Sequence, residues 1–229
     1  MQMGWIILIG FIVFVLFVRA IGKYYNGTDW GHPGTNVLDG WLRFYCKTFH
    51  RQSNAKINIP HGIPLIIVSN HLSAIDPFIL ITATDRPIRF MVAKEEYDKP
   101  VLNWMFRAAG CISVDRGGRV EGAFRSALRA INAGELVAIF PQGGIHSDSN
   151  PRERIKAGVI KLSQLSGCSL LPVRINGIAA PGTVLQSIVK RSHIKLDVSK
   201  IVDQETVLSE DFRSQLSDWF ISKRKKLTL

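Results

Sequence analysis

Short apolar runs alternate with helical segments along most of the chain, and this alternation restricts the fold more than any other feature. Six runs are rich in β-branched residues and are bounded by Gly, Pro, Asn or Asp, as strands usually are. The runs are PLIIVSN, IRFMVA, CISVD, ELVAIF, SLLPVRI and HIKLDVSKI, which begin at residues 64, 88, 111, 135, 169 and 193. Residues 77–84, 100–109, 120–132 and 154–166 carry apolar side chains at helical spacing. We therefore expect an α/β fold with a mixed, largely parallel sheet flanked by helices.

Three polar turns are expected to share one edge of this sheet. Residues 70–76, 115–118 and 141–147 each follow a predicted strand. Ligands of open α/β sheets bind beyond the carboxyl ends of the strands, which is where these turns would lie. This edge is therefore the predicted functional site.

The N-terminal segment predicts a membrane anchor. Residues 4–18, GWIILIGFIVFVLFV, carry no charge, and residues 20–22 can extend the run toward the ~20 residues that cross a bilayer. A cleaved signal peptide is the alternative, but the basic start and the small-residue cleavage site are missing. Arg19 and Lys23 lie on the C-terminal side of the run, which predicts that the following domain faces the cytoplasm.

The charge balance favours an anionic partner. Lys and Arg outnumber Asp and Glu by 29 to 18, which gives a formal net charge of +11. Beside a membrane anchor, this charge favours a phospholipid surface or a phosphorylated substrate over nucleic acid. The basic tail KRKK at 223–226 is either solvated or in contact with anionic lipid.

The segment after the anchor allows two interpretations. Residues 26–36 have no apolar period and predict a linker, and residues 38–49 form an amphipathic, aromatic-rich stretch with Arg43 and Lys47 expected at the surface. That stretch either lies in the membrane interface or packs against the sheet.

The number and spacing of the cysteines argue against a disulfide-stabilised protein and against a zinc protein. Cys46, Cys111 and Cys168 are odd in number and widely spaced, with no C-x-x-C pair. Neither a disulfide framework nor a zinc site is indicated, and we expect no metal or cofactor.

The stretch LIIVSNHLSAIDPFIL, residues 65–80, contains the strongest candidate for chemistry. His71 and Asp76 are five residues apart, about 140° from one another on a regular helix, so a turn is needed to bring them together. Pro77 suits the first helical position and Asp76 the N-cap, which leaves residues 71–75 as that turn. Asp76 can then bond one imidazole nitrogen and fix the tautomer, while the other nitrogen faces a substrate.

An isolated H-x-x-x-x-D is weak support for catalysis, since an Asp cap beside a surface His gives the same spacing. The sequence has no G-x-S-x-G nucleophile elbow. The attacking hydroxyl would therefore come from the substrate, with Ser73 as a less favoured nucleophile.

Four ordered blocks resemble the 1-acylglycerol-3-phosphate acyltransferase family. NHLSAID, from Asn70, is similar to the family pattern N-H-x-S-x-x-D. The other blocks are GCISVDRGG (110–118), FPQGGIHS (140–147) with RIKAG (154–158), and LLPVRINGI (170–178). The resemblance spans residues 60–180 and implies an O-acyltransferase. Together with the apolar N-terminal segment, it predicts an anchor at 1–25, a linker and possible interfacial helix at 26–59, and an acyltransferase domain at 60–229.

The resemblance also implies site roles. His71, oriented by Asp76, would deprotonate the hydroxyl of lysophosphatidate or a related lysophospholipid. That hydroxyl would then attack the thioester of acyl-CoA or acyl carrier protein at the cytoplasmic face of the membrane. Arg116, with Lys156 as a second candidate, would hold the acceptor phosphate.

The third block departs from the family pattern F-P-E-G-T-R-S. Gln142, Gly144 and Ile145 stand where the family has Glu, Thr and Arg. Gly143 and Gly144 still allow close backbone approach to an oxyanion, and Gln142 is expected to contact the acceptor. The lost Arg has possible replacements in Arg152, Arg154 and Lys156. Two alternatives remain: a non-catalytic membrane lipid-phosphate-binding relative, and an acyl-thioester hydrolase.

Overall fold

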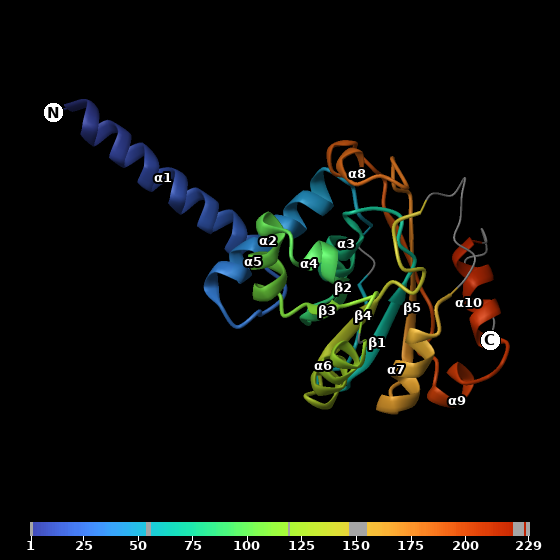
Figure 1. Ribbon diagram of the computed structural model, residues 1–229. Coiled ribbons are helices and arrows are strands. Elements are labelled where there is room, and N and C mark those ends of the chain that lie inside the picture. Colours follow the sequence, from blue (N-terminus) through green and yellow to red (C-terminus); the bar gives the residue numbers. More distant parts are fainter. Residues whose placement is uncertain (1, 54–55, 119, 147–154, 222–226, 228–229) are drawn as a thin grey trace.

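A computed structural model describes residues 2–53, 56–118, 120–146, 155–221 and 227. Within these residues, six strands form one sheet in the order β3-β2-β4-β1-β5-β6 (Figure 1). Strands β1 to β5 run parallel, and β6 pairs antiparallel with β5. The strands are β1 (Leu65–Ser69), β2 (Ile88–Ala93), β3 (Ile112–Val114), β4 (Leu136–Ile139), β5 (Leu170–Asn176) and β6 (Lys195–Val198). Five of the six strands lie inside their predicted runs, and β5 extends one residue beyond its run, to Asn176. The expected mixed, largely parallel sheet is confirmed.

Two apolar layers cover the sheet. On one face, α3 (Asp76–Ala83) packs on the strands; on the other lie α6 (Glu121–Asn132), α7 (Gly158–Ser166), α9 (Gln204–Val207) and α10 (Phe212–Ile221). Central strand β1 serves both layers, since Leu65 and Ile67 face α3 while Ile66 and Val68 face the opposite core. A strand buried on both faces needs consecutive apolar residues, which explains its sequence LIIV.

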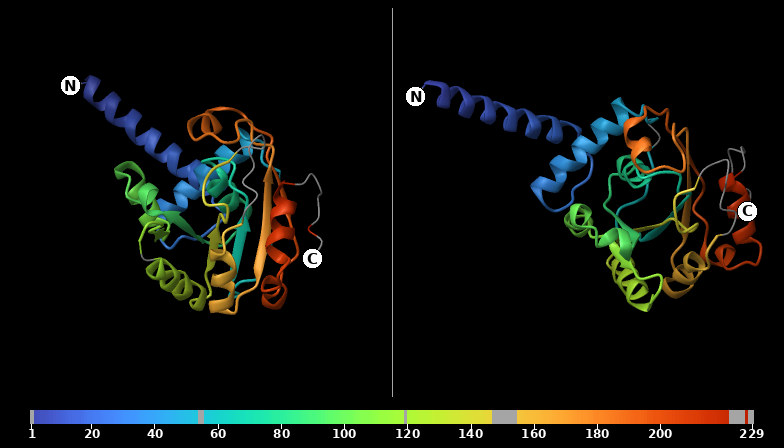
Figure 2. Two further views of the ribbon diagram at one scale, coloured as in Figure 1. Left: turned by 45° about the vertical axis from the view of Figure 1, so that its right-hand side comes forward. Right: turned by 45° about the horizontal axis from the view of Figure 1, so that its top comes forward.

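The long helix α1 (Gln2–Tyr25) projects away from the α/β body (Figure 2). Its 24 residues span about 36 Å, more than the ~30 Å hydrocarbon core of a bilayer. An 18-residue window within Met3–Tyr25 has a mean hydropathy of 2.6 and buries none of its residues in the protein. The helix is therefore long and apolar enough to cross a membrane.

Helices α1 and α2 (Pro33–Thr48) meet at two glycines. A Cβ added at Gly40 would lie 1.7 Å from the carbonyl oxygen of Gly22. The indole Nε1 of Trp41 donates to the carbonyl of Val18 at 3.0 Å, and the rings of Tyr25 and Phe44 lie 5.1 Å apart. The side chains of Trp41 and Phe44 are thus partly buried against α1.

Two expectations for this region were wrong. The linker ends at His32, not at residue 36, because the His32 ring accepts the N–H of Gly34 and Pro33 opens the helix. Arg43 is not a surface residue, since only 16% of its side chain is exposed. It donates to the carbonyls of Ile81, Thr82 and Thr84. Those carbonyls end α3 and attract a guanidinium.

The other helices refine the predicted boundaries. The predicted segment 100–109 is confirmed by α5 (Pro100–Ala108), which follows the short α4 (Lys94–Tyr97). Helix α7 begins at residue 158 rather than 154, and Arg152 and Arg154 lie outside the described residues, as does the tail at 223–226. Sequence reasoning missed α8 (Leu185–Val189), α9 and α10. The helical spacing of Phe212, Leu216 and Trp219, all buried in the second apolar layer, was the signal for α10.

Candidate active site

The turn after β1 is built around the carboxylate of Asp76. This side chain is fully buried, and its Oδ2 lies 2.9 Å from Nδ1 of His71. The same oxygen accepts the N–H groups of Leu72 and Ser73 at 2.6 and 2.8 Å, and Oδ1 accepts the Ser73 hydroxyl at 2.6 Å. The predicted pairing of His71 with Asp76 through a turn is confirmed as geometry.

The predicted N-cap role of Asp76 is wrong. Helix α3 begins at Asp76 itself, and the N-cap position is held by Ile75 without a side-chain bond. Four donors in residues 71–73 draw the carboxylate backward, away from the helix amides it was expected to cap. Asp76 therefore fixes the shape of the turn that carries His71.

The imidazole of His71 is positioned from two sides. Its ring stacks on the ring of Phe140 with centroids 4.2 Å apart. The ring of Phe140 also stacks on that of Phe90, with centroids 6.1 Å apart. Because a carboxylate only accepts hydrogen bonds, Nδ1 carries the hydrogen and the neutral ring keeps its lone pair on Nε2. The side chain is 19% exposed, so the ring is held firmly yet open to a small group.

The third sequence block is fastened to this turn. Gln142 is 2% exposed, and its Oε1 accepts the backbone N–H of His71 at 3.2 Å. Its Nε2 lies 3.2 Å from Nε2 of His146, whose backbone N–H donates to the carbonyl of His71 at 3.0 Å. Expected to contact the acceptor, the Gln142 carboxamide is instead turned toward protein groups and holds the His71 backbone.

The glycine turn within this block lies against a cation, Lys156. Gly143 has φ +76°, in the left-handed region that favours glycine. A Cβ there would lie 2.4 Å from Nζ of Lys156, so the exposed lysine crosses directly over the glycine. The Gly143 N–H donates to the carbonyl of Phe140 at 3.1 Å. It was predicted to bind an oxyanion, but this hydrogen bond already uses it. Gly144 remains the candidate donor of the pair.

Arg116 lies on the same edge of the sheet but on another turn. It is exposed after β3, where the Asp115 carboxylate accepts the N–H of Gly117 at 3.1 Å and lies 3.8 Å from Nζ of Lys94. Strands β2 and β4 separate β3 from β1. Three strand intervals of about 4.8 Å put the ends of β3 and β1 roughly 14 Å apart.

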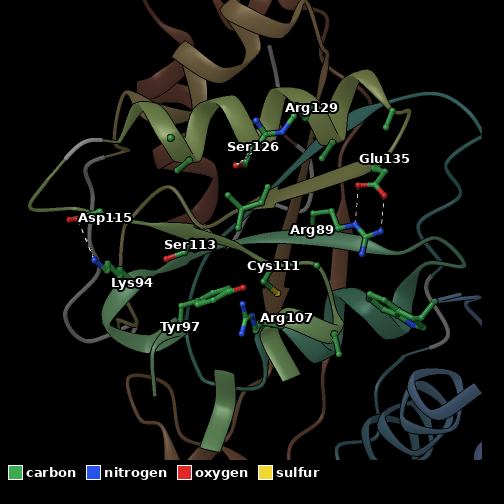
Figure 3. Close-up of a pocket in the computed structure, with 18 residues that line it drawn as sticks. Arg89, Lys94, Tyr97, Arg107, Cys111, Ser113, Asp115, Ser126, Arg129 and Glu135 are labelled. Atoms are coloured by element: carbon green, nitrogen blue, oxygen red, sulfur yellow. Dashed lines mark hydrogen bonds and ion pairs between the residues drawn. The ribbon is translucent and has the colours of Figure 1, made fainter. Parts of the chain in front are cut away.

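An open groove of about 950 Å³ runs along β3 (Figure 3). Four basic side chains line it against two acidic ones, so its charge is positive. The charged residues of the lining are Arg89, Lys94, Arg107, Arg129, Asp115 and Glu135. Arg89 is paired with Glu135 at 2.7 Å, whereas the exposed Arg107 projects toward the middle of the groove (Figure 3).

The remaining nucleophile candidates are unfavourable. Ser73 is fully buried and its hydroxyl donates to Asp76. Burial raises the pKa of the Cys46 thiol to about 12 and that of Cys111 to about 11, so both are protonated at neutral pH. In the described residues, no three His, Cys, Asp or Glu side chains are grouped to hold a metal ion.

Two residues that sequence reasoning did not assign also shape the site. The buried side chain of Asn70 accepts the N–H of Ile175 at 2.7 Å and donates to its carbonyl at 2.9 Å, which joins the ends of β1 and β5. His146 joins the third block to His71. Asn70 precedes His71 in the motif, but nothing in the sequence singled out His146.

A His–Asp pair with a free imidazole nitrogen, at the carboxyl edge of a parallel sheet, defines an acid–base site. Comparison with known proteins gives the class. A family model described as Acyltransferase matches residues 50–176, more than half of the chain. The chain therefore belongs to the acyltransferase family and is an enzyme that transfers acyl groups.

Individual relatives agree with this class. A 1-acyl-sn-glycerol-3-phosphate acyltransferase of Borreliella burgdorferi is 26% identical over 180 residues, which cover 75% of this chain and 70% of the relative. A probable enzyme of the same name from Mycoplasma genitalium is 27% identical over 182 residues, covering 70% and 67%. The N-acylphosphatidylethanolamine synthase of Arabidopsis thaliana is 31% identical over 113 residues, and the matched part of this chain spans only 40% of that protein.

The fold is also found in a solved structure. The crystal structure of the 1-acyl-sn-glycerophosphate (LPA) acyltransferase PlsC from Thermotoga maritima matches with a TM-score of 0.59 and 20% sequence identity. The match covers 92% of this chain and 86% of the other. The two chains share an architecture that includes the mostly parallel sheet.

Proposed function

We propose that this enzyme moves an acyl group from acyl-CoA or acyl carrier protein to the free hydroxyl of lysophosphatidate or a related lysophospholipid, in phospholipid biosynthesis. The observation that carries the proposal is the 2.9 Å contact between Nδ1 of His71 and Asp76, which leaves Nε2 as a base. Residues 60–229 would form the catalytic domain, residues 1–25 the anchor and residues 26–59 the connection between them.

The proposed chemistry uses only His71 as proton carrier. Nε2 takes the proton from the acceptor hydroxyl while that oxygen attacks the thioester carbonyl carbon. When the tetrahedral intermediate collapses, the carbon–sulfur bond breaks and the thiolate takes the proton back from the imidazolium. Asp76 stabilises the transient positive charge on the ring, and the amide of Gly144 is the candidate donor to the oxyanion.

Phosphate recognition is assigned to two cations. Lys156 is held over Gly143, beside the turn that binds His71, so its ammonium is the nearer candidate. Arg116 lies on the β3 turn, farther along the same edge. Both are exposed and can reach a phosphate at the surface of the site.

The test is to incubate the purified full chain with a panel of lysolipids and acyl-thioesters, and to measure free thiol and acylated lipid together. Equal amounts of both products are expected. Thiol release without acylated lipid would favour the hydrolase, and neither product would favour the non-catalytic relative.

The basic groove along β3 suits the anionic part of the donor. Reversing one exposed charge there, in Arg107→Glu, is expected to raise KM for acyl-CoA by about fivefold at low salt, within the range of one surface ion pair. The effect on kcat should be small, and high salt should remove the difference. Arg125→Glu changes an exposed arginine of α6 outside the groove lining and is the matched control. An equal effect of both substitutions would mean that only overall charge matters.

The anchor gives a separate prediction. Deletion of residues 1–23 is expected to move the protein from the membrane fraction toward the soluble fraction, since α1 buries none of its apolar window in the protein. Any remaining binding should be salt-sensitive, because basic side chains would dominate it. Sedimentation in low and high salt measures both effects. Salt-resistant binding of the truncated protein would show that another segment is the main anchor.

We propose that α1 leaves the domain on the cytoplasmic face.

A further inference from the structure

Helix α8 carries its apolar side chains on the outside. Leu185, Val189 and Val184 are 71%, 63% and 60% exposed, and Ile188 is 37% exposed. The residue of the helix that faces inward is polar: Ser187 is fully buried and its hydroxyl donates to the carbonyl of Val184. This is the reverse of the usual surface helix, whose apolar side faces the core. An apolar surface of this kind needs a partner outside the chain.

The helix is fixed to the part of the protein that holds the anchor. The Tyr45 hydroxyl of α2 donates to the carbonyl of Ile188, and Nε2 of His50 lies 2.8 Å from the same hydroxyl. Arg191 donates to the carbonyls of Thr48 and Phe49 at 3.3 and 3.2 Å. In both views of Figure 2, α2 runs from the base of α1 to α8, so the exposed apolar helix lies at the far end of the element on which the anchor packs.

The surface around α8 is basic. Residues 177–196 contain no Asp or Glu, and residues 40–53 contain none either. The exposed cations of these two segments are Lys47, Arg51, Lys190, Arg191 and Lys195. An apolar helix whose own segment and whose neighbouring segment carry exposed cations and no acidic residue matches the interface of a bilayer that contains anionic lipid.

The same segment is joined to the catalytic turn. The N–H of Gly182 donates to the carbonyl of Leu72 at 2.7 Å, and Thr183 forms an isolated parallel bridge with Ser73. Leu72 and Ser73 are the residues whose amides are held by Asp76. Residues 182 and 183, which lie just before α8, therefore contact the two residues that follow His71.

We propose that α8 is a second lipid-contacting element, which inserts Leu185 and Val189 into the headgroup region and sets the catalytic turn against the membrane surface. The occupant is the anionic bilayer that the proposed function already requires for α1, so this proposal rests on that function. An acceptor lipid could then present its hydroxyl to His71 without leaving the membrane.

The binding test uses the full chain in vesicles of phosphatidylcholine and phosphatidylglycerol. An environment-sensitive fluorophore on Leu185→Cys is expected to shift to the blue and to be quenched by spin-labelled lipid. The same label on Leu208→Cys, at an exposed position after α9, is expected to show neither change. Equal signals at 185 and 208 would overturn the proposal. So would shielding of residue 185 in lipid-free protein at high concentration, which would indicate a second copy of the chain.

The activity test uses the double variant Leu185→Asp, Val189→Asp, whose exposed positions should tolerate the change in the folded domain. Turnover of a lysolipid presented in vesicles is expected to fall by about tenfold, while turnover of a short-chain monomeric acceptor stays the same. Leu208→Asp is the matched control. Unchanged turnover in vesicles would overturn the proposal. If the unaltered enzyme acylated neither acceptor, the proposed function would fail, and the fluorescence measurement would still decide the lipid contact.

Discussion

Replacement of His71 by Ala is expected to lower kcat by a factor of about 10² to 10⁴, the usual cost of removing a general base. The fold should be retained, because the side chain is partly exposed and the carboxylate of Asp76 keeps its three hydrogen bonds from Leu72 and Ser73. Acyl transfer measured as thiol release and lipid product, together with a thermal unfolding curve, checks both expectations. Turnover near that of the unaltered enzyme, with unchanged stability, would exclude His71 as the base.

The chain supplies its own control for this experiment. His61 and Asp85 form a second His–Asp contact at 3.6 Å, with side chains 76% and 64% exposed. His61→Ala and Asp85→Asn remove a His and an Asp of the same kind from an open surface. Neither substitution should change turnover by more than a small factor.

Asp76 is expected to matter for stability as well as for rate. Asp76→Ala leaves the buried N–H groups of Leu72 and Ser73 without an acceptor, which should cost about 3 kcal/mol of unfolding free energy. For a chain of this size that loss corresponds to a Tm lower by about 6 to 12 °C. An unchanged Tm would contradict the role of the carboxylate in the turn.

Asp76→Asn separates the two roles of this residue. The amide oxygen can accept the three donors now bound by Oδ2, and the amide nitrogen can donate to a rotated Ser73 hydroxyl. The fold should therefore lose less stability than in Asp76→Ala. The rate should still fall strongly, because a neutral amide does not stabilise the imidazolium. Equal rates for the Asn variant and the unaltered enzyme would show that only the shape of the turn matters.

The sheet was predictable because its signal is local. The run LIIV before Asn70 is buried on both faces of β1, so every residue of it is apolar and the strand is visible in the sequence. Helix α10 carries a local signal as well, in the helical spacing of its buried Phe212, Leu216 and Trp219, and it was missed although that signal is present. Arg43 was misplaced because its ion pair with Asp39, one helical turn away, is equally typical of an exposed helix face. Its bonds to the carbonyls of residues 81, 82 and 84 come from a distant part of the chain, and no side chain near it in the sequence indicates them.

The candidate site was predictable in its residue types more than in its bonds. The spacing of His71 and Asp76 required a turn, and the structure contains that turn. Which donors the carboxylate accepts depends on backbone directions that spacing does not encode, so the cap prediction was wrong. The hydrogen bond from the Gly143 N–H to the Phe140 carbonyl likewise depends on the path of the loop, as does the burial of Gln142 against the His71 backbone.

The grip of Arg43 on the end of α3 has a geometric consequence. That helix is eight residues long, about 12 Å, and its first residue is Asp76. The Arg43 guanidinium donates to the carbonyls at the C-terminal end of α3. Helix α2, which carries Arg43, packs closely on α1 where Gly40 meets Gly22. The contact between α1 and α2, the hydrogen bonds of Arg43 and the helix α3 thus connect α1 to the carboxylate of Asp76. The distance between α1 and the carboxylate that orients His71 is consequently set by these contacts and by the length of α3.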